Sequence, residues 1–250
     1  MVIKDLLLEG IKELNNKENI NAQLEVRLIL AHILKVDKSY LYGHTDIEVS
    51  LEDVDRFKSL VEMRTKGRPI AYILNEKEFM GVDLYVEEGV LIPRGDTEII
   101  VEYVIDYINN TFGDSPFNLL DIGIGSGAIS LVLAKTFPNA RVIGLDLFEK
   151  PLKVAGKNKI NLGLKNVDFI KSDLFSSLNK EEFYNYFDII VSNPPYIPEG
   201  DIEDLEDDVK AFEPKEALSG GQDGLDFYRK ISKEARVFLK DHGLLVYEIG

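Results

Sequence analysis

The chain has 250 residues, of which 45% are hydrophobic and 29% are charged, the balance of a globular protein with a sizeable core. It contains no cysteine, which excludes disulfides and thiolate metal sites, and its three histidines are too scattered to suggest a zinc site. The formal net charge of −15, without a visible basic cluster, argues against a surface that follows a nucleic-acid backbone and favours a basic protein partner or a small ligand.

Residues 1–75 are expected to form a helical bundle. Asn21 is placed to cap a helix, and Ser50 with Asp53 has the spacing of a capping box before another helix, which Gly67 and Pro69 end. The apolar repeats expected on these two helices are Leu24, Leu28, Ala31 and Val36 on the first, and Leu51, Val54, Phe57, Leu60 and Val61 on the second. The bundle has no evident catalytic motif, so we expect it to recognise the substrate.

The pattern changes at about residue 76. Residues 76–95 combine β-type residues with glycines and are expected to form a β-hairpin linker. Residues 96–250 then alternate strand-like and helix-like segments, which predicts an α/β domain with a mostly parallel sheet and helices on both faces. The expected strands are residues 117–121, 141–146, 167–171, 187–192 and 244–249, with helices from about Ala128, around Pro151 and near residues 225–239.

A glycine-rich loop, Asp121-Ile-Gly-Ile-Gly-Ser-Gly127, follows the first of these strands and opens a helix. Glycines let a backbone turn sharply and approach a ligand closely. The G-x-G-x-G spacing differs from that of dinucleotide-binding loops and suits a methionine-derived sulfonium cofactor, which has no pyrophosphate; a plain tight turn is the alternative. The candidate cofactor-binding residues in the loop are Asp121, Gly123, Ile124, Gly125, Ser126 and Gly127.

Carboxylates end the next two strands. Asp146, followed by Leu147, can accept hydrogen bonds from both hydroxyls of a ribose. Asp173 can accept from an adenine amino group while Leu174 frames the ring. The carboxyl ends of parallel strands share one edge of the sheet, where open α/β sheets bind ligands, although solvated strand-end aspartates would give the same pattern.

The segment that indicates the chemistry is Asn193-Pro-Pro-Tyr196, directly after the fourth strand. Pro194 and Pro195 fix the backbone and remove two donors, and Asn193 adds a side-chain acceptor, so together they can hold a planar NH₂ group by both hydrogens. The Tyr196 ring can pack against that plane. Amide and aryl amine nitrogens are poor nucleophiles, and fixed acceptors orient the lone pair toward a methyl donor. These four residues are therefore the catalytic and substrate-binding candidates.

The chain resembles the HemK/PrmC family of peptide-chain release factor glutamine methyltransferases over nearly its whole length. Besides the Asn-Pro-Pro-Tyr segment, the stretches that carry the resemblance are Gly67-Arg-Pro-Ile-Ala-Tyr72, Glu78-Phe-Met-Gly81, Gly89-Val-Leu-Ile-Pro-Arg-Gly-Asp-Thr-Glu98 and Glu213-Pro-Lys-Glu-Ala-Leu218. The resemblance implies a Rossmann-like class I domain with a seven-stranded type of sheet. It also implies methyl transfer from S-adenosylmethionine, leaving S-adenosylhomocysteine, to N5 of the glutamine in the Gly-Gly-Gln motif of class 1 release factors.

The same resemblance implies roles for particular residues. Residues 123–127, Asp146, Leu174 and Asn193 would contact the cofactor, and residues 193–196 would hold the substrate glutamine. Leu174 stands where some relatives carry an aromatic ring, so weaker stacking on adenine is expected. Family members usually continue beyond Gly250, so we expect a truncated sequence that lacks the last strands. Gln222 completes an internal Gly-Gly-Gln, an accidental match in a Gly-Gly-x-Asp-Gly loop.

Three other functions fit the same motifs. An adenine-N6 nucleic-acid methyltransferase uses a similar motif, but the negative charge disfavours it. A ribosomal-protein glutamine methyltransferase and a non-enzymatic cofactor-binding scaffold are the remaining alternatives. No apolar run approaches the roughly 18 residues of a membrane span. We expect a cytoplasmic, metal-free monomer without direct contact to nucleic acid or membrane, in which the acidic run of residues 199–208 steers a basic substrate surface.

Overall fold

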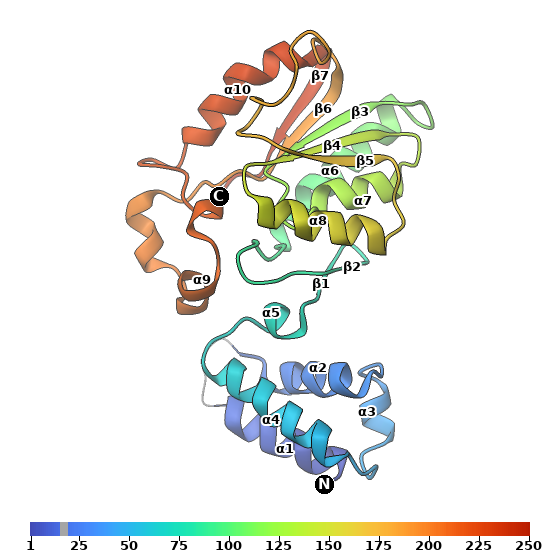
Figure 1. The fold of residues 1–250 in the computed structure, drawn as a ribbon, viewed down its shortest axis with the longest axis vertical. Helices are drawn as coiled ribbons and strands as arrows, with labels where there is room; N and C mark the ends of the chain where they lie inside the picture. Colours follow the sequence, from blue (N-terminus) through green and yellow to red (C-terminus); the bar gives the residue numbers. More distant parts are fainter. Residues whose placement is uncertain (16–19) are drawn as a thin grey trace. The chain divides into compact units, whose positions relative to one another are not determined.

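The computed structural model describes residues 1–15 and 20–250, which divide into Met1–Asn75 (unit 1) and Glu76–Gly250 (unit 2) (Figure 1). Unit 1 has one hydrophobic core, and unit 2 has a core on each face of its sheet. Within the described ranges, no helix combines the length and the apolar character that crossing a membrane requires.

Unit 1 is helical, as expected. Its described residues form α1 (Ile3–Leu14), α2 (Ala22–Leu34), α3 (Tyr40–Gly43), α4 (Leu51–Thr65) and α5 (Ile70–Leu74). Both predicted caps are confirmed, because Asn21 Oδ1 accepts from the Leu24 N–H and Ser50 Oγ accepts from the Asp53 N–H, each at 3.1 Å. Helix α4 ends two residues before Gly67, close to the expected stop.

The expected apolar repeats were partly wrong. Leu24 is 44% exposed and Leu51 is 80% exposed, whereas Val54, Phe57 and Val61 are buried as expected. Leu51 lies at the first position of α4, where its side chain remains in solvent. On α2 a different set of residues enters the core, and its spacing matches the helical repeat better than that of the expected set. These residues are Ala22, Val26, Ile29, Leu30 and Ile33.

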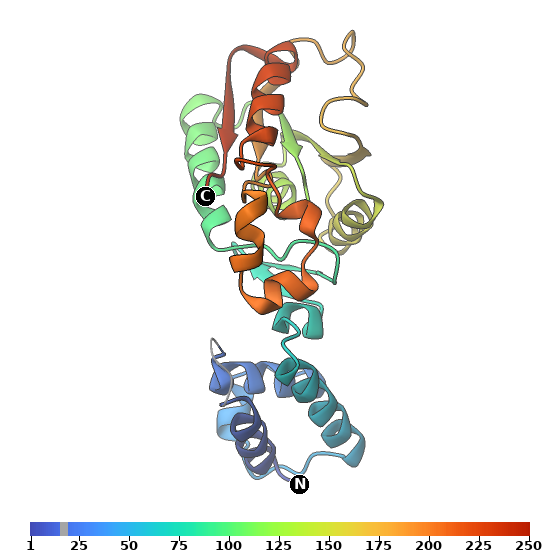
Figure 2. The same cartoon turned by 90° about the vertical axis from the view of Figure 1, so that its left-hand side faces the viewer.

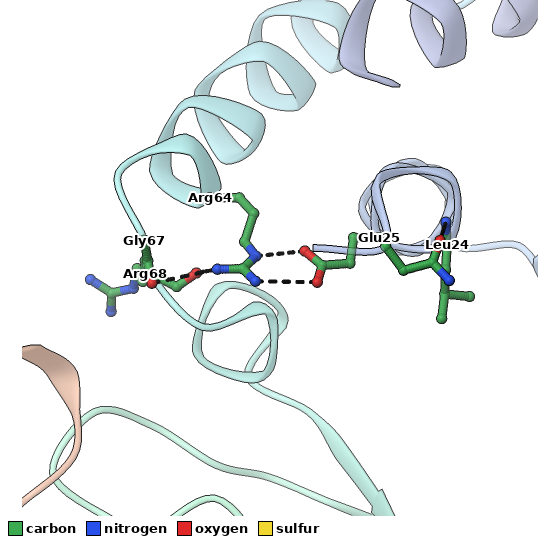
Figure 3. Close-up of polar contacts among 6 residues, drawn as sticks. Leu24, Glu25, Arg64, Gly67 and Arg68 are labelled. Atoms are coloured by element: carbon green, nitrogen blue, oxygen red, sulfur yellow. Dashed lines mark hydrogen bonds and ion pairs between the residues drawn. The ribbon is translucent and has the colours of Figure 1, made fainter. Parts of the chain in front are cut away.

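A buried ion pair joins α2 to α4 (Figure 3). Arg64 donates to both carboxylate oxygens of Glu25, from Nε at 2.5 Å and from Nη2 at 3.2 Å, which is the bidentate geometry favoured by a guanidinium. Its Nη1 also donates to the carbonyl oxygens of Gly67 and Arg68, at 3.5 and 3.4 Å. One side chain therefore ties the turn after α4 to α2.

Unit 2 contains a parallel sheet of five strands among the described residues, in the order β5-β4-β3-β6-β7. The strands are β3 (Asn118–Ile122), β4 (Arg141–Asp146), β5 (Val167–Lys171), β6 (Phe187–Ser192) and β7 (Leu239–Tyr247). The predicted parallel α/β sheet is thus confirmed, with β4, β5 and β6 at the expected bounds and β3 shifted by one residue. In register, Leu120 lies opposite Ile143 of β4 and Ile190 of β6.

Helices cover both faces of this sheet. The helices α6 (Asp96–Thr111), α7 (Ala128–Thr136) and α8 (Glu149–Asn161) belong to one side, and α10 (Asp226–Phe238) to the other. Alternate residues of a strand enter different cores: Leu119 packs with the α6 and α7 side chains, and Leu120 packs with α10. Figure 2 turns α10, the 3₁₀-helix η1 (Glu199–Asp204) and α9 (Asp207–Phe212) toward the viewer.

The expected hairpin is shorter than its sequence pattern suggested. Only β1 (Lys77–Phe79) and β2 (Val82–Leu84) pair, antiparallel, and residues 85–93 continue without strand pairing. Phe79, Val82 and Leu84 are buried in the same core as α6 and α7. Residues 76–95 therefore pack as part of unit 2.

The expected start of the last strand was also wrong. Strand β7 begins at Leu239, immediately after α10, and not at residue 244. Its polar opening is held by Lys240, whose Nζ donates to both carboxylate oxygens of Asp188 at 2.9 Å. The register between β6 and β7 shifts between Phe187 and Ile189, and His242 has a φ of 67°, so the alternation that marks a strand is interrupted there.

Candidate active site

A cavity of about 380 Å³ lies at the carboxyl ends of β3, β4, β5 and β6. Strands β3 and β6 are neighbours in the sheet, and the chain leaves them toward opposite faces, with α7 after one and α10 after the other. Open α/β sheets bind ligands at such a switch point. The volume falls within the roughly 300–1,000 Å³ of small-molecule sites. This is the ligand site that the fold offers.

The glycine loop forms one wall of this cavity. Gly123 and Gly125 line it, and Gly125 has a φ of 54°, a conformation that side chains with a Cβ rarely adopt. Gly127 performs a different task. A Cβ there would lie 2.9 Å from Leu131 Cδ1 and 3.0 Å from Ala155 Cβ, so its absence lets α7 pack against α8. The loop is shaped for close approach on one side and for helix packing on the other.

Asp146 lines the cavity at the end of β4 and is 9% exposed. Its Oδ2 accepts from the Gly125 N–H at 3.1 Å, and its Oδ1 accepts from the Phe148 N–H at 3.0 Å. Burial raises the pKa of Asp146, and these backbone hydrogen bonds oppose the rise. Each oxygen retains a lone pair, so the carboxylate can still accept hydrogen bonds from a bound diol.

Four residues of the expected cofactor set do not line the cavity: Asp121, Ile124, Ser126 and Gly127. Asp121 is 1% exposed, and its Oδ2 accepts from the N–H and the hydroxyl of Ser130 in α7, while its Oδ1 has no hydrogen-bond partner among the described residues. Desolvation by burial raises the pKa of Asp121 to about 7. Asp121 therefore joins β3 to the helix behind the loop.

The opposite wall combines a polar and an apolar part. Asp173 is exposed at the cavity mouth beside Leu174, which has a φ of 47°, and both line the cavity. Ser172 holds this turn, because its Oγ donates to the Leu174 carbonyl at 2.6 Å and accepts from the Ser177 N–H at 3.0 Å. Phe227 and Ile231 of α10 add apolar surface. Such a wall suits a flat aromatic ring with polar substituents at its rim.

Asn193 and Pro194 line this cavity and also a second one, of about 150 Å³. Tyr196 lines only the second cavity, together with Arg94 and Glu248. The predicted catalytic segment therefore separates two neighbouring cavities, with Pro195 on the first. Asn193 Nδ2 donates to Thr97 Oγ1 at 3.1 Å, which leaves its Oδ1 as the acceptor.

The structure adds residues that the motif reading had missed. Asn158 of α8 donates from Nδ2 to the Tyr85 carbonyl at 2.9 Å and to the Ser126 carbonyl at 3.0 Å, and so connects the segment before Gly89 to the glycine loop. Gly89, Val90 and Leu91 line the first cavity. A lone asparagine within a helix gives no sequence signal for this contact.

The Gly-Gly-x-Asp-Gly loop, residues 220–224, packs against the backbone of the predicted catalytic segment, residues 193–196. The Gly220 N–H donates to the Ile197 carbonyl at 2.8 Å, and a Cβ at Gly220 would lie 2.8 Å from the Pro195 carbonyl oxygen. A Cβ at Gly224 would come within 2.3 Å of the Tyr196 carbonyl oxygen. Gln222 itself is exposed. The glycines of this loop are required by close backbone packing, and the signal was the glycine pattern itself.

Arg94, which lines the second cavity, forms an ion pair with Glu213. Arg94 Nη2 lies 2.5 Å from Glu213 Oε1, and the Glu213 side chain is only 1% exposed while that of Arg94 is 41% exposed. Burial raises the pKa of Glu213, and the nearby guanidinium opposes the rise. The pair holds the segment before α6 against the segment that follows α9 (Asp207–Phe212).

Comparison with known proteins identifies the family. Residues 5–74 match the family model described as the PrmC N-terminal domain, and residues 114–248 match a methyltransferase domain. A release factor glutamine methyltransferase of Fusobacterium nucleatum is 42% identical over 98% of this chain and 68% of its own length. Those of Clostridium botulinum and Thermodesulfovibrio yellowstonii are 39% and 40% identical, over 100% and 97% of this chain and 87% and 85% of their own lengths. The chain belongs to the release factor glutamine methyltransferase family.

The first cavity fits the cofactor of a family methyltransferase, S-adenosylmethionine. Asp146 offers carboxylate acceptors for the ribose, and Gly123 and Gly125 leave room for backbone approach. Leu174 and Phe227 frame a place for the adenine, and Asp173 provides an acceptor at its edge. This cofactor supplies an electrophilic methyl group carried on a sulfonium.

The residues around the second cavity can prepare an amide nitrogen for methyl transfer in this methyltransferase. The side-chain oxygen of Asn193 and the backbone carbonyl oxygens of Pro194 and Pro195 are hydrogen-bond acceptors. The two prolines have no backbone N–H that could compete for them. An NH₂ group held by these acceptors would lie where the two cavities meet, because Asn193 and Pro194 line both. The same acceptors would stabilise the positive charge that develops on such a nitrogen.

Proposed function

We propose that this protein transfers a methyl group from S-adenosylmethionine to the N5 amide nitrogen of the glutamine in the Gly-Gly-Gln motif of class 1 peptide chain release factors. The observation that carries the proposal is the position of Asn193 and Pro194, which line both the larger and the smaller cavity. The relatives at about 40% identity are named release factor glutamine methyltransferases, which supports this substrate.

The size of the second cavity supports a glutamine side chain as its occupant. Its volume of about 150 Å³ suits a single side chain and is small for a flipped nucleobase with its sugar. Its lining mixes apolar residues such as Leu91 and Ile197 with the polar ends of Tyr196 and Glu248. An extended methylene stem ending in a planar amide matches this mixture.

The acidic run supports a basic protein partner. Residues 199–208 form the 3₁₀-helix η1 (Glu199–Asp204) and the start of α9, and Leu205 lines the second cavity. The carboxylates of Asp201, Glu203 and Asp204 are exposed. Negative charge beside the cavity draws a positively charged substrate surface toward it.

We assign recognition of the release factor body to unit 1, and place the reaction in the cytoplasm with the enzyme acting as a monomer.

The proposal is tested by incubating the protein with radiolabelled S-adenosylmethionine and a full-length release factor. Label should enter the release factor and should be abolished when the glutamine of its Gly-Gly-Gln motif is replaced by asparagine, because the shorter side chain does not reach between Asn193 and Pro194. Ribosomal proteins and duplex DNA serve as competing substrates. Label in either of these, with none in the release factor, would contradict the proposal.

A further inference from the structure

Glu248 is a buried carboxylate beside the catalytic segment. Its residue is 5% exposed, follows β7 directly and lines the second cavity. The Glu248 N–H donates to the Ser192 carbonyl at 3.1 Å, which fixes its backbone next to the residue that precedes Asn193. Its Oε2 has no well-formed hydrogen bond to any described residue. A buried acceptor with spare capacity is costly unless it serves a purpose.

Three side chains that can donate hydrogen bonds lie near this carboxylate. Burial raises the pKa of Glu248, and the neighbouring side chains of Thr97, Asn193 and Tyr196 oppose that rise. The Asn193 amide also donates to Thr97 Oγ1 at 3.1 Å, so the Thr97 hydroxyl proton is free to point at Glu248. An ionised carboxylate can only accept, so each of these three side chains can meet it only as a donor.

The direction of hydrogen bonding determines which end of the Asn193 side-chain amide faces the substrate. A side-chain amide can rotate by half a turn and exchange its oxygen for its NH₂ group at nearly the same shape. In the rotated form, the NH₂ of Asn193 would face the NH₂ of the substrate glutamine, and two donors would oppose each other. Because Thr97 Oγ1 accepts from its nitrogen and the Glu248 carboxylate lies nearby as a further acceptor, Asn193 presents its oxygen to the substrate.

Glu248 also contributes charge at this position. Among the described residues no cation forms an ion pair with it, since the cavity's Arg94 is paired with Glu213 at 2.5 Å. The other charged neighbour is Asp96, which is also acidic. When it is ionised, this buried carboxylate favours the positive charge that develops on an amide nitrogen as it is methylated.

We propose that Glu248 is a positioning residue for methyl transfer, which acts with Thr97 to hold the Asn193 amide with its oxygen toward the substrate nitrogen. The proposal rests on the proposed function and extends it to two residues outside the Asn-Pro-Pro-Tyr segment. In methyl transfer the nitrogen–methyl bond would form as the sulfur–methyl bond breaks, with the bonding electrons staying on sulfur, and the methylated nitrogen would then release one proton to solvent. Glu248 takes no part in either bond.

The test uses the full chain with the substitutions E248Q, T97V and T97S, and E234Q at an exposed position of α10 as a matched control. The first readout is the side-chain NH₂ signal of Asn193 in nitrogen-15 NMR, assigned by its loss in N193A. E248Q should shift this signal and speed its exchange with water, because the glutamine NH₂ no longer accepts. T97V should act in the same direction and T97S should preserve the wild-type signal.

The second readout is steady-state methyl transfer to release factor. E248Q should lower kcat by roughly 10- to 100-fold, with KM for the release factor and affinity for S-adenosylmethionine within about twofold of wild type. T97V, a milder change that also covers the case in which E248Q does not fold, should lower kcat less. E234Q should match wild type in both readouts.

Two results would overturn the proposal. One is an E248Q protein with an unchanged Asn193 signal and unchanged kcat. The other is a loss of cofactor affinity in E248Q as large as the loss of kcat, which would indicate a general structural role. If the wild-type protein does not methylate release factor at all, the proposed function fails, while the NMR signal of Asn193 still decides whether Glu248 holds its amide.

Discussion

Asn158 and Tyr85 exchange two hydrogen bonds, in which the Asn158 side chain pairs with the Tyr85 backbone as a neighbouring strand would. Asn158 Oδ1 accepts from the Tyr85 N–H at 2.7 Å, and Nδ2 donates to the Tyr85 carbonyl at 2.9 Å. The same Nδ2 donates to the Ser126 carbonyl in the glycine loop. One buried side chain thus holds together two segments of the cofactor cavity wall.

Replacing this side chain should weaken cofactor binding as well as stability. Asn158→Ala leaves buried backbone groups of Tyr85 and Ser126 without partners, so the free energy of unfolding should fall by about 1–3 kcal/mol. Affinity for S-adenosylmethionine, measured by calorimetry, should fall several-fold because residues 89–91 lose their anchor.

Asn166 offers a matched control. Its Nδ2 donates to the carbonyls of Ala134, Phe137 and Ala140, away from the cavity. Asn166→Ala should destabilise the fold by a similar amount and leave cofactor affinity close to wild type. An equal loss of affinity in both variants would show that Asn158 has no particular role at the cavity.

The Glu25–Arg64 ion pair should be sensitive to loss of one partner. The two side chains are 12% and 8% exposed, so Glu25→Ala leaves a buried guanidinium without its counter-charge. The free energy of unfolding of unit 1 should fall by about 3–5 kcal/mol. Urea denaturation measures this, with Glu9→Ala as the control, because Glu9 and Lys58 form an ion pair at 2.8 Å whose side chains are 34% and 47% exposed. The control should change by less than about 1 kcal/mol; equal effects would refute the distinction.

Asp121 should make stability depend on pH. Its pKa in the folded protein is raised from 3.8 to about 7, so folding favours the protonated form. The stabilising contribution is present in full below about pH 4 and is lost as the pH rises through about 7. Asp121→Asn, which is neutral throughout, should therefore gain stability relative to wild type between about pH 4 and about pH 8. Urea denaturation at both pH values tests this, and a constant difference between the two proteins would contradict it.

The acidic run should set the encounter rate with the release factor. Replacing Glu203 and Asp204 by their amides should lower kcat/KM by about threefold at low salt and leave kcat unchanged, because long-range attraction acts before chemistry. Glu181 and Glu182 are exposed acidic residues outside this run. Replacing both by glutamine removes the same charge and should have no such effect. Stopped-flow association at several salt concentrations distinguishes the two variants, and salt-independent association of the wild type would exclude steering.

Several local features of this fold could be predicted from the sequence. Strands β4, β5 and β6 lie at the predicted residues because short, mostly apolar runs between polar boundaries allow few other structures. The turn chemistry of the glycine loop and of Asn193-Pro-Pro-Tyr196 was also visible, since both depend on backbone properties of glycine and proline.

What the sequence did not indicate depends on partners distant along the chain. The start of β7 was hidden because Lys240 becomes favourable only when it meets Asp188. Leu24 looked like a core residue until the phase of α2 was fixed by packing. Asn158 and Glu248 are single polar residues that meet distant parts of the chain, Tyr85 for Asn158 and the Ser192 backbone for Glu248, and no local pattern encodes such contacts.

The most direct test of the central claim is mass spectrometry of a purified release factor after incubation with this protein and S-adenosylmethionine. Peptide mapping should find a single added methyl group on the glutamine of the Gly-Gly-Gln motif, and Asn193→Ala should abolish it while still binding the cofactor. A methyl group on any other residue, or equal methylation by the Asn193→Ala variant, would contradict the account.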